Sequence, residues 1–228
     1  MTGLGRVLVT GGASGLGASI ARAVARAGGT PVVLDHREPP YPVEHEVVDL
    51  ADTGEAEGAV RRAAERLGGL EAVVASAGID SCGPLGEVDA ERWERVVRVN
   101  LLGTAAVVRA ALPYLDRSRG KVVTVASTLG LRGVPDATAY CASKFGVVGF
   151  TRAFAAETAG RIGVTLLVPG GMETAFFDGR PERYRPPDGL RLNRPDDVAE
   201  TVLFALRQPP GCEIRELLVA PSEEPSWP

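Results

Sequence analysis

Tyr140 and Lys144 stand four residues apart in the stretch Ala139–Gly146. On a helix this spacing places both side chains on one face, one turn apart. A phenol is a poor base at neutral pH because its pKa is about 10, but a nearby ammonium group favours the phenolate and lowers that pKa. The pair therefore predicts a tunable proton donor and acceptor. The alternative is an amphipathic helix with one solvated lysine, and the rest of the chain must decide between the two.

A glycine-rich turn near the N-terminus has the pattern of a phosphate-binding site. The strand-like run Arg6–Thr10 leads into G-x-x-x-G-x-G, with glycines at 11, 15 and 17, and a helical pattern from Ala18 to Ala27 follows. Such glycines let the backbone approach a pyrophosphate, which then lies at the positive N-terminus of the helix. The alternative is a plain strand–turn–helix connection with flexible glycines.

An acid at the end of the second strand bears on the choice of cofactor. Thr30–Asp35 is a buried strand pattern, and Asp35 lies 18 residues after Gly17. A carboxylate near this spacing accepts hydrogen bonds from the adenosine ribose and repels a 2′-phosphate. We therefore expect NAD, with NADP left open because Arg37 follows two residues later. A turn aspartate without a ligand is the alternative.

Short apolar runs alternate with helical patterns along the whole chain. Strands are expected at 6–10, 30–35, 44–48, 71–75, 121–126, 163–168 and 213–219, and helices at 18–27, 53–67, 89–115, about 140–159 and 195–206. This alternation predicts an α/β, doubly wound fold with a mostly parallel seven-stranded sheet and helices on both faces. We expect one domain over 1–228, with a substrate loop near 173–194. Three prolines between His36 and Pro42 predict an irregular crossover there instead of a helix.

The composition excludes several classes of protein. The net charge of −4 gives no reason to expect a nucleic-acid partner. No apolar run approaches the length of a membrane span, and Met1 leads directly into a strand-like run without a signal peptide. Cys82, Cys141 and Cys212 are odd in number and far apart, so neither a disulfide framework nor a metal site is expected. A cytoplasmic protein with reduced thiols is the expectation.

Together these residues resemble the short-chain dehydrogenase/reductase family over nearly the whole chain. Thr10–Gly17 matches T-G-x-x-x-G-x-G, Tyr140–Lys144 matches Y-x-x-x-K, and Pro169–Thr174 matches P-G-x-x-x-T. Ser127 stands 13 residues before Tyr140 and Asn100 stands 40 before it, as in the family's catalytic tetrad. The resemblance implies a Rossmann-like fold and an NAD(P)-dependent oxidoreductase that acts on a secondary alcohol or ketone.

The resemblance also implies residue roles. Tyr140 would exchange a proton with the substrate oxygen and Ser127 would hold that oxygen. Lys144 would lower the phenol pKa and bind the nicotinamide ribose, while Asn100 would anchor a water that links Lys144 to solvent. The cofactor-binding residues implied are Gly11, Ser14, Gly15, Leu16, Gly17, Asp35, Asp49, Leu50, Ala77, Gly78, Tyr140, Lys144, Pro169, Gly170, Met172 and Thr174.

The chain departs from the family pattern at two places that matter for the site. Ser76 stands where the family has the asparagine of N-A-G, so any cross-strand hydrogen bond that it makes must differ. The helix that usually follows the second strand is missing from the pattern. All four tetrad positions are filled, so neither departure removes a catalytic residue. Both concern the segments that hold the site in place.

Two other functions compete with the oxidoreductase. A non-catalytic dinucleotide-binding redox sensor is disfavoured because a sensor would be expected to lack the tyrosine or the lysine. An isomerase, epimerase or dehydratase is disfavoured because relatives with those activities carry a longer C-terminal substrate domain.

The helices near 93–115 and 140–159 are apolar nearly all round, which indicates burial on more than one side. Since the family commonly pairs these helices between subunits, we expect a homodimer or homotetramer.

Overall fold

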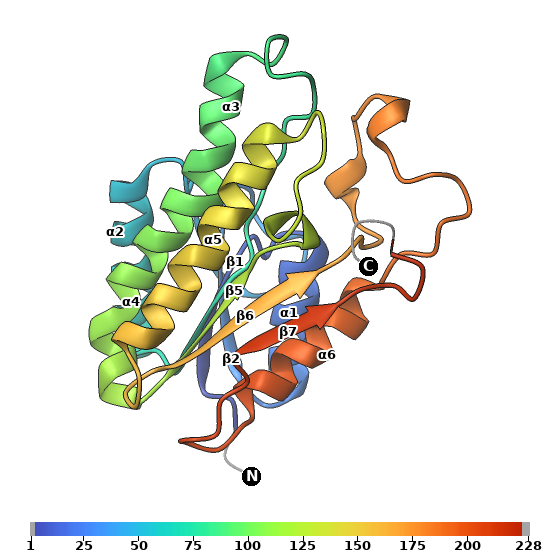
Figure 1. Ribbon diagram of the computed structural model, residues 1–228. Coiled ribbons are helices and arrows are strands. Elements are labelled where there is room, and N and C mark those ends of the chain that lie inside the picture. The colour runs from blue at the N-terminus through green and yellow to red at the C-terminus, as the bar shows by residue number, and fades with distance from the viewer. Residues whose placement is uncertain (1–2, 225–228) are drawn as a thin grey trace.

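A computed structural model of the chain describes residues 3–224. At its centre lies a seven-stranded sheet in the order β3-β2-β1-β4-β5-β6-β7, with every neighbouring pair parallel (Figure 1). The strands are β1 (Arg6–Thr10), β2 (Thr30–Asp35), β3 (Glu44–Val47), β4 (Ala72–Ala75), β5 (Lys121–Val125), β6 (Gly163–Pro169) and β7 (Glu216–Val219). The predicted doubly wound, Rossmann-like fold is confirmed.

Helices cover both faces of this sheet (Figure 1). One apolar cluster lies beneath α2, α4 and α5, and a second lies beneath α1 and α6. The helices are α1 (Gly15–Arg26), α2 (Thr53–Leu67), α3 (Ala90–Val97), α4 (Thr104–Ser118), α5 (Thr138–Glu157) and α6 (Pro195–Leu206). Because the strand order reverses between β1 and β4, the carboxyl ends of these two strands border the crevice in which such folds bind ligands.

The long helix predicted over 89–115 is interrupted. A π-helical turn, η1 (Arg98–Gly103), separates α3 from α4 and carries Asn100. Single π turns inside α-helices occur frequently at functional sites. The other boundaries differ by a few residues: α1 begins at Gly15 instead of Ala18, and β7 begins at Glu216 instead of Glu213.

The crossover between β2 and β3 is irregular, as its prolines predict. Tyr41 and Val43 from this segment pack against the apolar cluster beneath α1 and α6. The Arg22 guanidinium of α1 lies 5.1 Å from the centre of the Tyr41 ring. Two side chains from an extended segment therefore cover sheet surface that the missing helix leaves open.

One helical segment corrects an expectation about membranes. The continuous helical run Ala90–Ser118 is long and apolar enough to cross a membrane by length and composition, although no such run was expected. In this fold, 56% of its most apolar window is buried, because α4 packs on α2 and the sheet. This burial is what a core helix shows.

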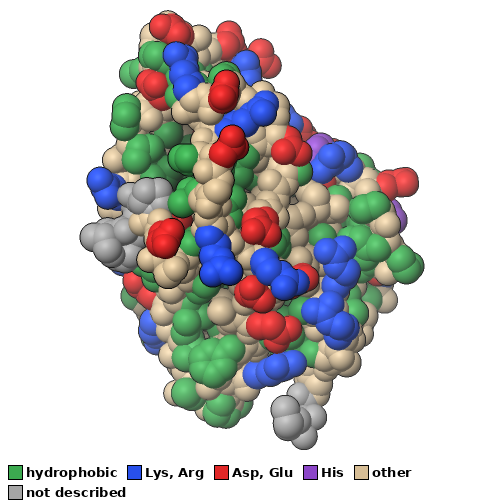
Figure 2. Space-filling model, turned by 90° about the vertical axis from the view of Figure 1, so that its right-hand side faces the viewer, with side chains coloured by type: hydrophobic (Ala, Val, Ile, Leu, Met, Phe, Trp, Pro, Cys, Tyr) green, Lys and Arg blue, Asp and Glu red, His purple; other side chains and the backbone are tan. Residues whose placement is uncertain are grey.

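On the face drawn in Figure 2, basic and acidic side chains are interspersed.

Candidate active site

The glycine turn lies at the carboxyl end of β1, where β2 and β4 meet it. Gly11 has a positive φ of 71°, and a Cβ there would come within 2.8 Å of the Ala77 Cα. A Cβ on Gly17 would collide with the Gly11 carbonyl. Both positions therefore require glycine. The first turn of α1, from Gly15 through Leu16 and Gly17, follows Ser14 in extended conformation and presents free N–H groups to an anion.

Asp35 at the end of β2 braces this turn. Its side chain is buried, and one carboxylate oxygen accepts a hydrogen bond from the Ala13 N–H at 2.9 Å. The other oxygen accepts from the Arg37 N–H at 3.1 Å and lies 3.0 Å from the His36 ring. A nitrogen of the Arg37 side chain lies 3.4 Å from the Ser14 hydroxyl. The Asp35 carboxylate and the Arg37 guanidinium thus both lie near the place where the adenosine ribose is expected.

A hydroxyl replaces the asparagine that the family pattern has after β4. Ser76 donates its hydroxyl hydrogen to the Thr10 carbonyl, and the Ser76 and Ala77 N–H groups donate to the Thr10 hydroxyl oxygen at 3.1 Å each. The cross-strand tie between β1 and β4 is therefore made, in a different form. A Cβ on Gly78 would come within 3.4 Å of Lys144 Nζ and 3.6 Å of Asn100 Oδ1.

Two of the predicted cofactor-binding residues, Asp49 and Leu50, lie just after β3. The Asp49 carboxylate accepts from the Ala51 N–H at 3.0 Å and pairs with Arg95 at 2.8 Å. Partial burial acts to raise the Asp49 pKa, but these two hydrogen bonds outweigh it, and the pKa lies below its usual value. Leu50 is buried against the close approach of Gly103. Asp49 thus provides a charged hydrogen-bond acceptor, and Leu50 provides an apolar side chain, in the segment after β3.

Asn100 is held by three hydrogen bonds to protein atoms. Its amide nitrogen donates to the Ile79 carbonyl at 2.9 Å and to the Ser143 hydroxyl at 3.0 Å, while its Oδ1 accepts from the Ile79 N–H at 2.8 Å. The Asn100 carbonyl in turn accepts from the Thr104 hydroxyl at 2.8 Å. Asn100 thus connects the π turn to the end of β4 and to α5. The water link from Asn100 to Lys144 stays a prediction.

Lys144 and Ser127 both lie close to Tyr140. The Lys144 ammonium group donates to the Val125 carbonyl at 2.8 Å, and its Nζ lies 5.6 Å from the centre of the Tyr140 ring. Burial lowers the Lys144 pKa to about 8. Ser127 follows β5, caps the short 3₁₀ helix η2 (Thr128–Gly130) and is hydrogen-bonded to the Tyr140 side chain. The structure therefore brings the tyrosine, lysine and serine of the predicted tetrad together.

The pKa of Tyr140 is raised, although the sequence predicts a lowered value. Burial is the largest cause, because it disfavours the phenolate, while the hydrogen bond with Ser127 acts in the opposite direction. The Phe176 ring covers Tyr140, with 5.6 Å between ring centroids. In this environment the phenol stays protonated at neutral pH, which is the state that a proton donor requires.

The P-G-x-x-x-T segment runs from the end of β6 across the glycine turn. Pro169 ends β6, the Gly170 N–H donates to the Val219 carbonyl at 2.9 Å, and Met172 packs on the cluster beneath α1 and α6. A Cβ on Gly15 would lie 3.4 Å from the Thr174 Cγ2. Two motifs that are more than 150 residues apart in the sequence therefore meet at one edge of the sheet.

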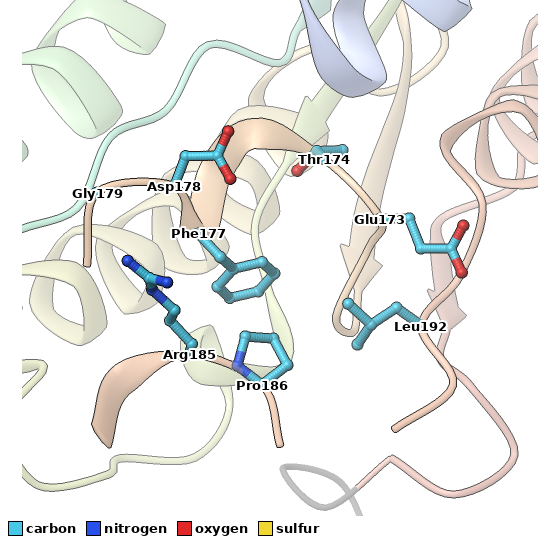
Figure 3. Close-up of a pocket in the computed structure, with 8 residues that line it drawn as sticks. All are labelled: Glu173, Thr174, Phe177, Asp178, Gly179, Arg185, Pro186 and Leu192. Atoms are coloured by element: carbon cyan, nitrogen blue, oxygen red, sulfur yellow. The ribbon is translucent and has the colours of Figure 1, made fainter. Parts of the chain in front are cut away.

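A cavity of about 410 Å³ lies within the predicted substrate loop. Figure 3 shows the Phe177 ring beside Pro186, with Arg185 on one side and Leu192 on the other. Thr174 is the one lining residue that also belongs to the predicted cofactor set. Neither Tyr140 nor Ser127 lines this cavity.

Sequence analysis misses several residues near the site. Asp80, two residues after Gly78, has a largely buried side chain that lies 3.0 Å from a side-chain nitrogen of Arg180 in the substrate loop. An acid in the turn after the predicted strand 71–75 was an available signal for Asp80. Phe176 and Arg180 lie in a segment without periodicity, where no signal distinguishes them.

Comparison with known proteins identifies the family. The family described as short chain dehydrogenase matches residues 5–185, which is more than half of the chain. The chain belongs to this family. The predicted family and the predicted class of enzyme, a dehydrogenase or reductase, are both confirmed. The matched range includes the glycine turn, the tyrosine–lysine pair and Thr174, whereas α6 and β7 lie beyond it.

Named relatives of this short-chain dehydrogenase differ widely in length. The chain is 33% identical over 217 residues to 3-oxoacyl-(acyl-carrier-protein) reductase FabG of Thermotoga maritima, covering 86% of this chain and 88% of that protein. It is 32% identical to glycine betaine reductase ATRR of Emericella nidulans over 96% of this chain, but spans only 19% of that protein. A Burkholderia cenocepacia short chain dehydrogenase solved with NADP has a TM-score of 0.83 and 27% identity, over 95% of this chain and 96% of that one.

Proposed function

We propose that this protein is an NAD(P)-dependent oxidoreductase that interconverts a secondary alcohol and a ketone. The observation that carries the proposal is the arrangement of Tyr140, hydrogen-bonded to Ser127 and flanked by the buried Lys144, beside a glycine turn. The similarity to a reductase and to an NADP-bound short chain dehydrogenase supports the same class of reaction.

The residues present fit a dinucleotide. Gly11 and Gly17 allow the close backbone packing of the turn, since a Cβ at either position would collide with neighbouring backbone, and the first turn of α1 offers N–H groups to a pyrophosphate. Asp35 would accept hydrogen bonds from the ribose hydroxyls, and Lys144 would bind the nicotinamide ribose. When bound, the nicotinamide supplies or accepts the hydride.

The protein's own groups would handle the proton. For reduction, Ser127 holds the carbonyl oxygen of the substrate and Tyr140 donates a proton to that oxygen as it gains negative charge. The raised pKa of Tyr140 keeps the phenol protonated before the reaction, which suits a proton donor. General acid help of this kind contributes roughly 10²–10⁴-fold in rate. Lys144, with its pKa of about 8, provides a charge that stabilises the phenolate left behind.

The choice of cofactor belongs to the same proposal. The buried Asp35 carboxylate favours NAD(H), because it would repel a 2′-phosphate. Arg37 is the counterweight, since its guanidinium lies beside Ser14. We expect a preference for NADH that Arg37 keeps from being absolute.

A substrate screen tests the proposed activity. Purified protein is mixed with NADH or NADPH and a panel of cyclic, aromatic and aliphatic ketones, and cofactor oxidation is followed at 340 nm. The account expects turnover of at least one ketone above the rate without substrate. Cofactor binding by calorimetry with no turnover of any ketone, or of the corresponding alcohols with NAD⁺ or NADP⁺, would favour the redox-sensor alternative.

The predicted homodimer or homotetramer remains part of the proposal. Leu102 of η1 and Phe145 of α5 are each 47% exposed, although both are large and apolar. A Cβ on Gly146 would lie within 2.6 Å of Leu101, so η1 and α5 pack closely and present these side chains on adjacent elements. We expect light scattering at micromolar concentration to give at least twice the monomer mass. Phe145→Asp should then lower that mass, and a wild-type monomer would contradict the proposal.

A further inference from the structure

An arginine of the substrate loop lies largely buried beside an aspartate from the segment that follows β4. The Arg180 side chain is 15% exposed and that of Asp80 is 7% exposed. Arg180 Nη2 lies 3.0 Å from Asp80 Oδ2 and is buried, but no hydrogen bond with suitable geometry forms there. The contact is therefore an ion pair in a water-poor setting, where either charge without the other would be strongly destabilised.

Asp80 is a fixed anion. Its Oδ1 accepts from the Ser81 N–H at 2.6 Å and its Oδ2 accepts from the Cys82 thiol at 3.1 Å. Burial, and then the hydrogen bond to Asp80, raises the pKa of the Cys82 thiol to about 11, so the thiol keeps the proton that it donates. These neighbours hold Asp80 in one position, whereas Arg180 belongs to a loop that joins β6 at one end and α6 at the other.

Arg180 connects Asp80 to the ring that covers the catalytic tyrosine. Its guanidinium carbon lies 4.6 Å from the centre of the Phe176 ring and 4.8 Å from that of Phe177. Phe176 in turn lies 5.6 Å from Tyr140, centroid to centroid. Cation–π contacts of this length are attractive. One continuous series of contacts thus runs from Asp80 through Arg180 and Phe176 to Tyr140.

The rest of the loop is attached at its base and at one further point. At the base, the Glu173 N–H donates to the Asn193 carbonyl at 2.9 Å, and the Asn193 N–H donates to the Gly171 carbonyl at 3.0 Å. Beyond the base, Tyr184 donates its hydroxyl hydrogen to the Asp136 carboxylate at 2.9 Å. The Asp80–Arg180 pair is the attachment that lies next to Tyr140, through the Phe176 ring.

We infer that the Asp80–Arg180 ion pair holds the substrate loop closed over Tyr140, and that Arg180 is a positioning residue which seats Phe176 against the phenol. Substrate enters and product leaves when this pair opens, and the closed pair excludes water from the reacting atoms. The effect on turnover rests on the proposed function, but the closure of the loop does not.

Limited proteolysis tests closure without any substrate. Arg183 and Arg191 are trypsin sites within the loop, since neither is followed by proline. Asp80→Asn should be cut at these sites at least fivefold faster than the wild type, and so should Arg180→Gln. The double variant should be cut no faster than either single variant, because both changes remove one interaction. Glu94→Gln, which breaks the exposed pair between Glu94 of α3 and Arg98 of η1, is the matched control and should behave as the wild type.

Steady-state kinetics then separates positioning from general stability. Both single variants should lose at least tenfold in kcat/KM for a ketone while the Kd for NADH changes less than threefold. If Asp80→Asn does not fold, Arg180→Gln carries the test, because it lies in the loop outside the sheet. Wild-type cleavage rates in Arg180→Gln would overturn the inference. Faster cleavage with no ketone turned over by the wild type would uphold loop closure and refute only the proposed activity.

Discussion

Tyr41 donates its hydroxyl hydrogen to the Gly12 carbonyl at 2.6 Å, which connects the proline-rich crossover to the glycine turn. This hydrogen bond holds the loop that is expected to surround the pyrophosphate. Because a hydrogen bond contributes about 1 kcal/mol net, Tyr41→Phe should raise the Kd for NADH about fivefold, measured by calorimetry. Tyr114→Phe is the control, since Tyr114 also carries an arginine on its ring, Arg117. An unchanged Kd in Tyr41→Phe would show that the turn needs no such support.

The charge of Asp35 should set the preference for cofactor. Asp35→Asn removes the negative charge but keeps an oxygen that can accept from the Ala13 N–H. The ratio of kcat/KM for NADPH to that for NADH should therefore rise about tenfold, which corresponds to ~1.4 kcal/mol.

Arg37→Met provides the opposite test of the same region. Removal of the guanidinium beside Ser14 should lower kcat/KM with NADPH and leave that with NADH nearly unchanged. A wild-type protein that already prefers NADPH would contradict the assignment of Asp35.

We expect Lys144 to lower the stability of the fold, because its charged form is buried. Burial lowers its pKa from 10.5 to about 8, so between these pH values the unfolded chain holds a proton that the folded chain has released. The free energy of unfolding therefore decreases as the pH falls from 10.5 to 8. Below pH 8 the lysine is charged in both states, and the decrease is complete. Lys144→Met should raise the free energy of unfolding in urea by about 2 kcal/mol at pH 7.

The same comparison at pH 10.5 is the control on this explanation. There the gain from Lys144→Met should nearly disappear, because the lysine is uncharged in the folded protein and only half charged in the unfolded chain. Lys121→Met, at the chain's other lysine, should give a smaller gain or none at pH 7, since Lys121 is only partly buried and its ammonium group donates to the Leu206 carbonyl at the end of α6. A pH-independent gain at Lys144 would point to packing as its cause.

Most of the fold follows from local patterns in the sequence. The buried strands are continuous runs of Val, Leu and Ala, and helices such as α2 begin at an acid that caps them, as Asp52 does by accepting from the Glu55 N–H at 3.0 Å. The irregular crossover follows from its prolines, since proline cannot occupy a helix interior. These features depend on neighbours in the chain, so the sequence alone specifies them.

The features that the sequence does not specify depend on distant partners. Nothing near Asn100 marks a π turn, because its hydrogen bonds reach Ile79 and Ser143 in other elements. The raised pKa of Tyr140 comes from burial beneath Phe176, which lies 36 residues away in a loop without periodicity. The spacing of residues in the sequence predicted which side chains meet at the site. Their pKa values depend on burial, which the spacing does not predict.

The central claim is that Tyr140 is the proton donor, and Tyr140→Phe tests it most directly. The variant keeps the ring that packs on Phe176 and loses only the hydroxyl. With a ketone found in the screen, kcat at saturating NADH should fall by roughly 10²–10⁴-fold, while the Kd for NADH and the melting temperature stay near the wild-type values. A kcat within a few fold of the wild type, with cofactor binding intact, would contradict the account.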